Sequence, residues 1–329
     1  MSAETFDPIN PGYARTFTAG RMSLGLVVPI ERYDQSPMPT MERQLERIRM
    51  AEELGFAAVW LRDVPLNVAN FGDAGQVFDP FVYLGLLSGA TRNIALGVAS
   101  LVLPLRHPLH VAKAAASVDR LSNGRLLLGI ASGDRPEEYP AMALDHASRG
   151  ARFRDSFDYI RKAAAPWPRF ESAQGRYDGF SDLIPKPYGE RLPLLMTGGS
   201  RQDPDWLASH GDGWILYPRP AELQGKIIAD WRARSRNARG TINPAMQPLY
   251  IDLVDNPPPL PQPLHLGWRL GVEHLRDMLF EVEASGINHL AFNLRLNTAD
   301  TEATLEKLAA HVLPHFPTTT VRLHERLYA

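Results

Sequence analysis

Two short polar turns in the sequence could bind an anion. The turn Thr197-Gly198-Gly199-Ser200 follows one apolar run, and Ser132-Gly133-Asp134 follows another. Glycine lets backbone N–H groups approach a phosphate closely, and the positive end of a following helix adds attraction. Residues 197–200 are the better candidate, because a helix is expected soon after them, at residues 204–210. The alternative is a tight turn that needs glycine only for its backbone angles.

Arg62, Asp63 and His107 are the candidates for proton transfer. Arg62 and Asp63 directly follow the apolar run FAAVWL, and His107 stands between Arg106 and Pro108. Each of the three could exchange a hydrogen bond or a proton with a reacting group. The alternatives are a structural ion pair and a histidine whose hydrogen bonds are satisfied within the fold.

Other kinds of catalytic site find no support. The chain has no cysteine, and its ten histidines show no H-E-x-x-H spacing, so we expect no metal site. The sequence also contains neither a G-x-S-x-G nucleophile elbow nor a phosphate-binding P-loop.

Eight apolar runs alternate with segments of helical periodicity, which is the pattern of a (β/α)8 TIM barrel. The expected strands are residues 22–30, 56–61, 94–103, 125–131, 192–197, 213–217, 245–254 and 288–294. The expected helices are residues 40–54, 81–90, 109–121, 151–165, 204–210, 221–237, 271–284 and 301–312. A doubly wound sheet is disfavoured, because no G-x-G-x-x-G follows the first strand.

The barrel explains how distant candidates could meet. Active sites of such barrels lie at the carboxyl ends of the strands, where each candidate above is expected. We expect residues 1–329 to form a single domain, with an N-terminal arm packed on the outside over about residues 1–20. Loop insertions are expected at about 63–79, 166–192 and 255–268, with a tight turn at 177–180. The first and third insertions could cover the site as lids.

The composition limits the partners and the location that we expect for the protein. The net charge is −2 with 22% charged residues, so no basic excess points to nucleic acid. The longest apolar run is about a dozen residues, too short to cross a membrane. The first residues do not resemble a signal peptide, and we therefore expect a cytoplasmic protein.

The stretch from Leu96 to Gly129 resembles the signature region of the bacterial luciferase-like monooxygenase family, in the branch of luciferase-type oxidoreductases. The matching residues are Leu96-Gly97-Val98-Ala99-Ser100, Pro104, Pro108, Asp119, Ser122-Asn123-Gly124-Arg125 and Leu128-Gly129. Gly55-Phe56, Trp60-Leu61, the glycine turn at 198–200 and Asp212-Gly213 also fit, so the likeness covers roughly residues 22–315. Where the luciferases have a histidine pair after the second strand, this chain has Arg62-Asp63.

The resemblance implies flavin mononucleotide (FMN) or the deazaflavin F420 at the carboxyl face of the barrel. It further implies a non-proline cis peptide at Ala99–Ser100, supporting the flavin ring. The phosphate would lie between Ser132-Gly133 and the turn formed by Thr197, Gly198, Gly199 and Ser200.

Our main hypothesis is a flavin-dependent monooxygenase that uses FMNH2 and oxygen on a small organic substrate. A separate flavin reductase would supply the reduced flavin, and the resemblance implies a homo-oligomer. The alternatives are F420-dependent hydride transfer, which Arg135, Arg149, Arg152 and Arg154 keep open, and a non-catalytic flavin-binding barrel.

Overall fold

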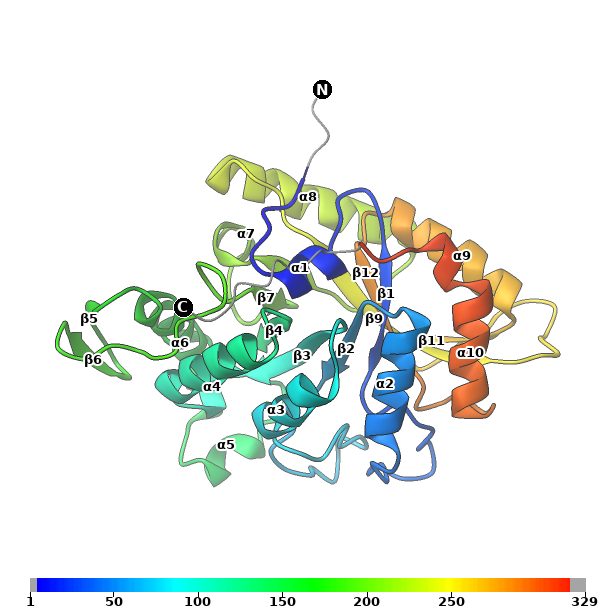
Figure 1. Cartoon of the computed structure of the whole chain (residues 1–329), viewed down its shortest axis with the longest axis horizontal. Helices are drawn as coiled ribbons and strands as arrows, with labels where there is room; N and C mark the ends of the chain where they lie inside the picture. The colour runs from blue at the N-terminus through cyan, green and yellow to red at the C-terminus, as the bar shows by residue number, and fades with distance from the viewer. Residues whose placement is uncertain (1–4, 320–329) are drawn as a thin grey trace.

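A closed parallel barrel forms the centre of the computed structural model, which describes residues 5–319. Eight parallel strands close on themselves within these residues, because β12 joins β9 to β1 and β8 pairs in turn with β9 (Figure 1). They are β1 (Ser23–Val27), β2 (Ala58–Leu61), β3 (Ala95–Val102), β4 (Leu126–Ala131), β7 (Leu194–Thr197), β8 (Gly213–Ile215), β9 (Ala245–Leu253) and β12 (His289–Asn293). The prediction of a (β/α)8 barrel is confirmed.

Helices surround the barrel, and each expected helix is present. They are α2 (Gln44–Leu54), α3 (Pro80–Ala90), α4 (Pro108–Leu121), α6 (Arg149–Ala163), α7 (Pro204–His210), α8 (Ala221–Arg239), α9 (Val272–Ala284) and α10 (Thr301–His311). Several begin at a capping aspartate, because Asp79, Asp203 and Asp300 each accept a first-turn N–H. Helix α2 begins four residues later than expected. The backbone N–H of Thr40 donates to Glu31 Oε1 at 2.7 Å, and its hydroxyl donates to Oε2 at 2.8 Å, which holds this segment out of the helix.

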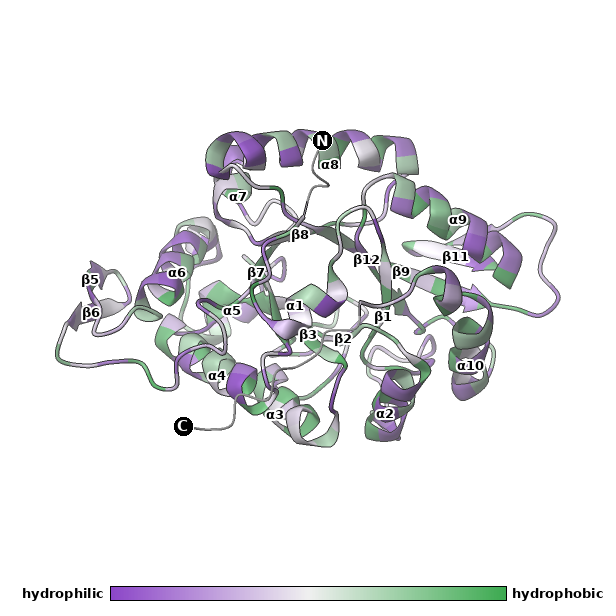
Figure 2. Cartoon of the chain, turned by 45° about the horizontal axis from the view of Figure 1, so that its top comes forward, coloured by the Kyte–Doolittle hydropathy of each residue, from purple (hydrophilic) through white to green (hydrophobic). Residues whose placement is uncertain are grey.

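The N-terminal arm closes one end of the barrel. Its short helix α1 (Pro11–Thr16), which the sequence did not indicate, lies across the ring of strands (Figure 2). The Tyr13 hydroxyl donates to the Asp212 carbonyl at 2.6 Å, and the Asn10 amide donates to Asp119 at 3.0 Å. Residues 1–4 of the predicted arm and 320–329 of the predicted domain lie outside the described residues, and the single domain stays a prediction.

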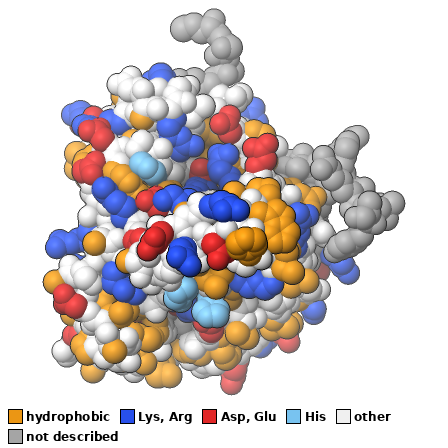
Figure 3. Space-filling model, turned by 90° about the vertical axis from the view of Figure 1, so that its left-hand side faces the viewer, with side chains coloured by type: hydrophobic (Ala, Val, Ile, Leu, Met, Phe, Trp, Pro, Cys, Tyr) orange, Lys and Arg blue, Asp and Glu red, His pale blue; other side chains and the backbone are white. Residues whose placement is uncertain are grey.

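Two insertions carry hairpins. The first, β5 (Arg169–Ser172) with β6 (Gly175–Asp178), is antiparallel, and its turn falls at residues 173–174 rather than at the expected 177–180. On the side where this hairpin lies, hydrophobic side chains gather beside basic ones (Figure 3). The second pairs β10 (Gln262–Leu264) with β11 (Gly267–Leu270), and β11 extends the sheet beside β9. The loop before α3 contains no helix or strand over residues 62–79. Short helical turns add α5 (Glu138–Ala141), Leu103–Leu105, His146–Ser148 and Leu313–His315.

A buried hydrogen-bond chain fills the barrel centre. The indole Nε1 of Trp60 donates to His289 Nε2 at 2.8 Å. Because an indole N–H can only donate, the ring proton of His289 lies on Nδ1, which donates to Ser23 Oγ at 2.7 Å. The Ser23 hydroxyl in turn donates to the Thr16 carbonyl at 2.6 Å. His289 is fully buried, and this burial lowers its pKa to about 3.

Glycines make room for this chain. A Cβ at Gly97 would lie 2.3 Å from the Trp60 ring, and one at Gly25 would lie 2.7 Å from the His289 ring. Gly97 belongs to the stretch that carries the family resemblance, and a glycine is needed there because a side chain would meet the Trp60 ring. Arg125 of the same stretch is also structural, because its buried guanidinium donates to Thr91 and to the carbonyls of Ser88 and Ile94.

No described helix is long and apolar enough to cross a membrane.

We predict that His289 makes unfolding pH-dependent. The unfolded histidine has a pKa near 6.5, whereas the folded one is depressed to about 3. Its contribution is therefore complete above pH 6.5 and falls by about 1.4 kcal/mol per pH unit between pH 6 and 4. Urea unfolding at several pH values should show a shallower decline for His289→Asn. The exposed control His110→Asn should keep the wild-type slope, and equal slopes for all three proteins would refute the prediction.

Candidate active site

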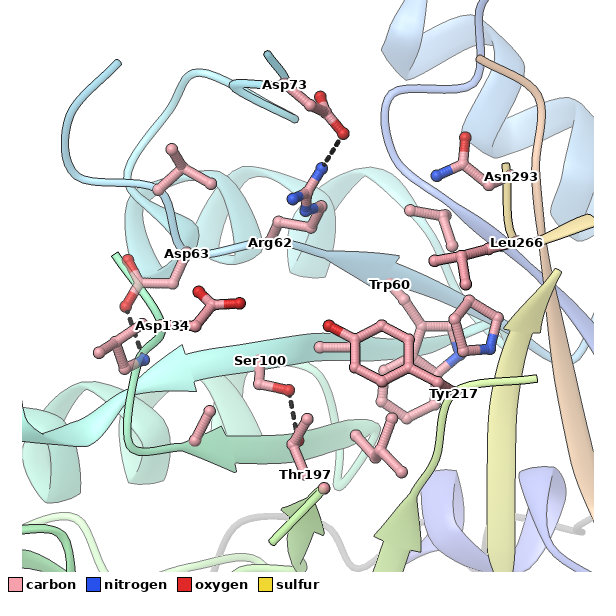
Figure 4. Close-up of a pocket in the computed structure, with 18 of the residues that line it drawn as sticks. Trp60, Arg62, Asp63, Asp73, Ser100, Asp134, Thr197, Tyr217, Leu266 and Asn293 are labelled. Atoms are coloured by element: carbon pink, nitrogen blue, oxygen red, sulfur yellow. Dashed lines mark hydrogen bonds and ion pairs between the residues drawn. The ribbon is translucent and has the colours of Figure 1, made fainter. Parts of the chain in front are cut away.

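A pocket of about 840 Å³ opens at the carboxyl ends of the strands. All eight barrel strands contribute to its lining, as (β/α)8 barrels require of their active sites. Apolar side chains form the floor, among them Val27, Trp60, Ile215, Met246 and Ala291. Polar groups surround this floor (Figure 4). The volume falls within the range of cofactor and ligand pockets.

Strand β3 bulges into the pocket at Ala99 and Ser100. The peptide bond between them is cis, as the resemblance implies. The register of β3 with β4 shifts between Val98 and Leu101, so these two residues leave the regular ladder. The Ser100 hydroxyl is thereby brought into hydrogen-bond contact with the Thr197 hydroxyl of β7 (Figure 4).

Arg62 and Asp63 are neighbours in the chain with different partners. The side chain of Asp63 is almost completely buried and holds Arg106 through two bonds, of 2.7 and 3.1 Å. It also accepts the Val102 N–H at 3.0 Å, which fixes the end of β3. Asp63 therefore anchors the wall of the pocket.

Arg62 is directed toward the loop that follows it. Its Nη1 donates to Asp73 Oδ2 at 2.6 Å (Figure 4). Burial alone would lower the pKa of Arg62, but the attraction and hydrogen bond of Asp73, together with Tyr250 and Tyr33, raise that pKa above its usual value. Asp73 also accepts from the Tyr33 hydroxyl at 3.1 Å and pairs with Arg295 at 3.3 Å. These contacts tie the middle of loop 62–79 to the barrel.

The glycine turn lies at the edge of the pocket. Thr197, Gly198 and Ser200 line the pocket, whereas Gly199 does not. Gly198, Ser200 and Arg201 have φ values of 52°, 42° and 59°, a left-handed run that turns the chain sharply. A Cβ at Gly198 or Gly199 would meet no atom within 4 Å, so the turn faces open space.

Two basic side chains, Arg201 and Arg149, belong to the glycine turn and the adjacent start of α6. The Gln202 side chain donates to the Gly150 carbonyl at 2.8 Å, which joins the turn to the first residues of α6. Burial lowers the pKa of His146, and the nearby charges of Arg149 and Arg201 lower it further. Ser132 and Gly133 also line the pocket. An anion near the turn would find an open backbone, a helix N-terminus and two guanidinium groups.

His107 lies outside the pocket lining. Because α4 begins at Pro108, His107 takes the N-cap position, where its Nδ1 accepts the Leu109 N–H at 3.2 Å. Its Nε2 donates to the Gln174 carbonyl at 2.9 Å, which connects it to the β5–β6 hairpin. The structure thus gives this exposed ring a capping contact in place of the expected position at the pocket.

Other residues reach the pocket without a sequence signal. His265 and Leu266 arrive from the β10–β11 turn, so the third insertion does extend to the mouth. Glu138 lies seven residues beyond the end of β4 and is buried in the pocket wall. No cluster of metal-ligating side chains was found among the described residues.

Comparisons with known sequences agree on one family. A family model described as luciferase-like monooxygenase matches residues 22–248. An uncharacterized protein of Mycobacterium tuberculosis is 30% identical in a match of 212 residues that covers 57% of this chain and 73% of that protein. The oxygenase component of a flavin-dependent trigonelline monooxygenase of Acinetobacter baylyi is 32% identical over 188 residues, 56% of this chain and 50% of that protein.

Solved structures share the fold at low identity. The oxygenating constituent of 3,6-diketocamphane monooxygenase of Pseudomonas putida, in complex with FMN, has a TM-score of 0.71 at 13% identity and covers 91% of this chain and 100% of that one. An F420-dependent secondary alcohol dehydrogenase also has a TM-score of 0.71, at 16% identity, and covers 89% of this chain and 98% of that one. With a family model that spans most of the chain and a closed barrel, the protein belongs to the luciferase-like monooxygenase family.

Proposed function

We propose that the protein is a flavin-dependent monooxygenase that binds reduced FMN in the pocket and acts on a small organic substrate. The observation that carries this proposal is that the β3 bulge and the glycine turn border one pocket over an apolar floor. The relative from Acinetobacter baylyi is named as an oxygenase component, which supports a separate reductase as the source of reduced flavin. Bound FMN would supply the redox chemistry with oxygen.

The residues present fit such a cofactor. Its phosphate would lie by the turn of Thr197, Gly198, Gly199 and Ser200, with Ser132 and Gly133 opposite. Ala99 and Ser100 would support its ring, because their bulge projects into the pocket beside Thr197. Arg62 would bind the substrate or the ring through the N–H groups that Asp73 does not take. Asp63 would act on the site only by holding β3 and Arg106, and His107 is assigned no role.

F420-dependent hydride transfer is the second candidate function. The basic residues at the start of α6 and in the glycine turn favour it, because the F420 tail carries more negative charge than FMN. The fold is shared with an F420-dependent dehydrogenase.

Cofactor binding and oxygen uptake test the proposal. We expect the purified protein to bind FMN with a dissociation constant below about 1 mM and to consume oxygen when given FMNH2. Tighter binding of F420 without oxygen uptake would favour the second candidate. If neither cofactor binds, both candidates fail.

Gly199→Asp tests where the phosphate binds. The added carboxylate would extend from the open turn at the edge of the pocket, and we expect its repulsion of a phosphate bound there to weaken FMN binding by about tenfold or more. Riboflavin lacks the phosphate and should bind the variant and the wild type equally. Gly199→Ala is the matched control, because its methyl group meets no atom within 4 Å. Unchanged FMN affinity in Gly199→Asp would contradict this placement.

We also propose that two copies pair through α3. This helix contains no charged residue, and its Val82 and Leu86 are 74% and 54% exposed. An apolar helix face left in water is typical of an interface. We expect wild type to sediment as a dimer and Val82→Glu/Leu86→Glu as a monomer. Leu121→Glu, at a site 66% exposed on α4, is the control and should remain dimeric. A monomeric wild type would exclude the interface.

A further inference from the structure

Arg135 and Glu138 form a pair of buried polar groups in the pocket wall whose hydrogen-bonding capacity is incomplete. They are only 5% and 2% exposed, and both line the pocket. Arg135 Nη1 and Glu138 Oε1 have no hydrogen-bond partner within the described chain. These two atoms lie 3.8 Å apart, too far for a hydrogen bond between them. Buried polar atoms are seldom left unpaired, because their desolvation is then uncompensated.

The loop after β2 holds this pair in place. Arg135 Nη2 donates to the Asp73 carbonyl at 3.0 Å, and its guanidinium lies 3.9 Å from the centre of the Phe71 ring. The backbone N–H of Leu66 lies close enough to the Glu138 carboxyl to lower its pKa. The remaining N–H and carboxyl oxygen are therefore a fixed donor and acceptor 3.8 Å apart, on two residues that line the pocket.

The gap between them matches one kind of ligand group. An oxygen atom about 2.8 Å from each would form a triangle with the two atoms. A hydroxyl group can accept from the guanidinium and donate to the carboxylate at once. A carboxylate would be repelled by Glu138, and an ammonium group by Arg135. The aromatic rings of Trp60, Phe71 and Tyr217, which also line the pocket, favour a flat ligand.

We propose that Arg135 and Glu138 form the subsite for the hydroxyl group of a phenolic substrate. The inference rests on the proposed monooxygenase function and names its substrate class. In this subsite the phenol O–H bond breaks, its proton passes to Glu138 Oε1, and the electron pair stays on the phenol oxygen beside Arg135 Nη1. The resulting phenolate has an electron-rich ring, which favours electrophilic transfer of an oxygen atom to a ring carbon.

The charges around Glu138 suit this exchange. Burial raises the pKa of Glu138 to about 7, Arg135 lowers it, and Asp63 and Asp134 raise it. The group can therefore take up and release a proton near neutral pH.

Two small ligands that differ by one hydroxyl group test the subsite. We would titrate the full chain, without flavin, with 4-methylphenol and with toluene by calorimetry. Wild type should bind 4-methylphenol about tenfold or more tightly than toluene, because charged groups complete two hydrogen bonds to the hydroxyl. Glu138→Gln should lose most of this preference while it binds toluene as wild type does. Glu137→Gln is the matched control, with the same charge change at an exposed neighbour.

Three results would overturn the proposal: equal affinity of wild type for the two ligands, an unchanged preference in Glu138→Gln, or an equal loss of both ligands in that variant. FMN affinity is measured separately on the same proteins. A wild type that prefers the phenol but does not bind FMN would disprove the flavin function and leave the hydroxyl subsite intact.

Discussion

The hydrogen bond from Trp60 to His289 holds in place the side chain on which the floor of the pocket depends. A closed barrel of eight strands has an interior that side chains must fill. Here an indole and a neutral imidazole fill it, and Gly25 and Gly97 leave them room. The Trp60 ring and its apolar neighbours form the floor of the pocket. The floor is therefore largely apolar, and the charged groups Arg62 and Asp63 line the pocket beside it.

The rim is held by two carboxylates from one segment that perform separate tasks. Asp63 binds Arg106 and the backbone of β3, so it fixes the bulge at Ala99 and Ser100. Asp73 binds Arg62, Arg295 and Tyr33, so it fixes the loop above the pocket. Both are buried, and an unpaired buried charge is costly, so the arrangement is stable only as a complete set. The charged groups around the pocket are therefore held in position before any ligand binds.

The proposals assign different parts of one pocket to different chemistry. The glycine turn and the start of α6 offer a positive, open edge for a phosphate. The bulge and the apolar floor offer a surface for a flat ring. The wall formed by Arg135 and Glu138 offers a donor and an acceptor to a hydroxyl group. A cofactor and a substrate could thus share the pocket without competing for the same polar groups.

The range of the forces involved explains which parts of the structure could be predicted from the sequence. Apolar patterns are local, and they predicted the eight strands, the eight helices and the barrel. The same patterns indicated that Arg62 and the glycine turn stand at strand ends. They missed the true start of α2, because Glu31 holds Thr40 from outside the helix. They placed His107 at the site, although the start of α4 at Pro108 gives it a capping contact instead.

The sequence alone did not predict which charged groups pair with one another. Arg62 and Asp63 read as one pair, yet Arg62 binds Asp73 of the loop that follows it, and Asp63 binds Arg106, which only the closed barrel brings near. Glu138 carries no local signal at all, because its burial depends on a loop that begins after a different strand. By itself the sequence determined the number and order of the barrel elements, since these depend on neighbouring residues. Only the tertiary structure decided which polar groups are paired and which are left for a ligand, because pairing depends on distances across the barrel.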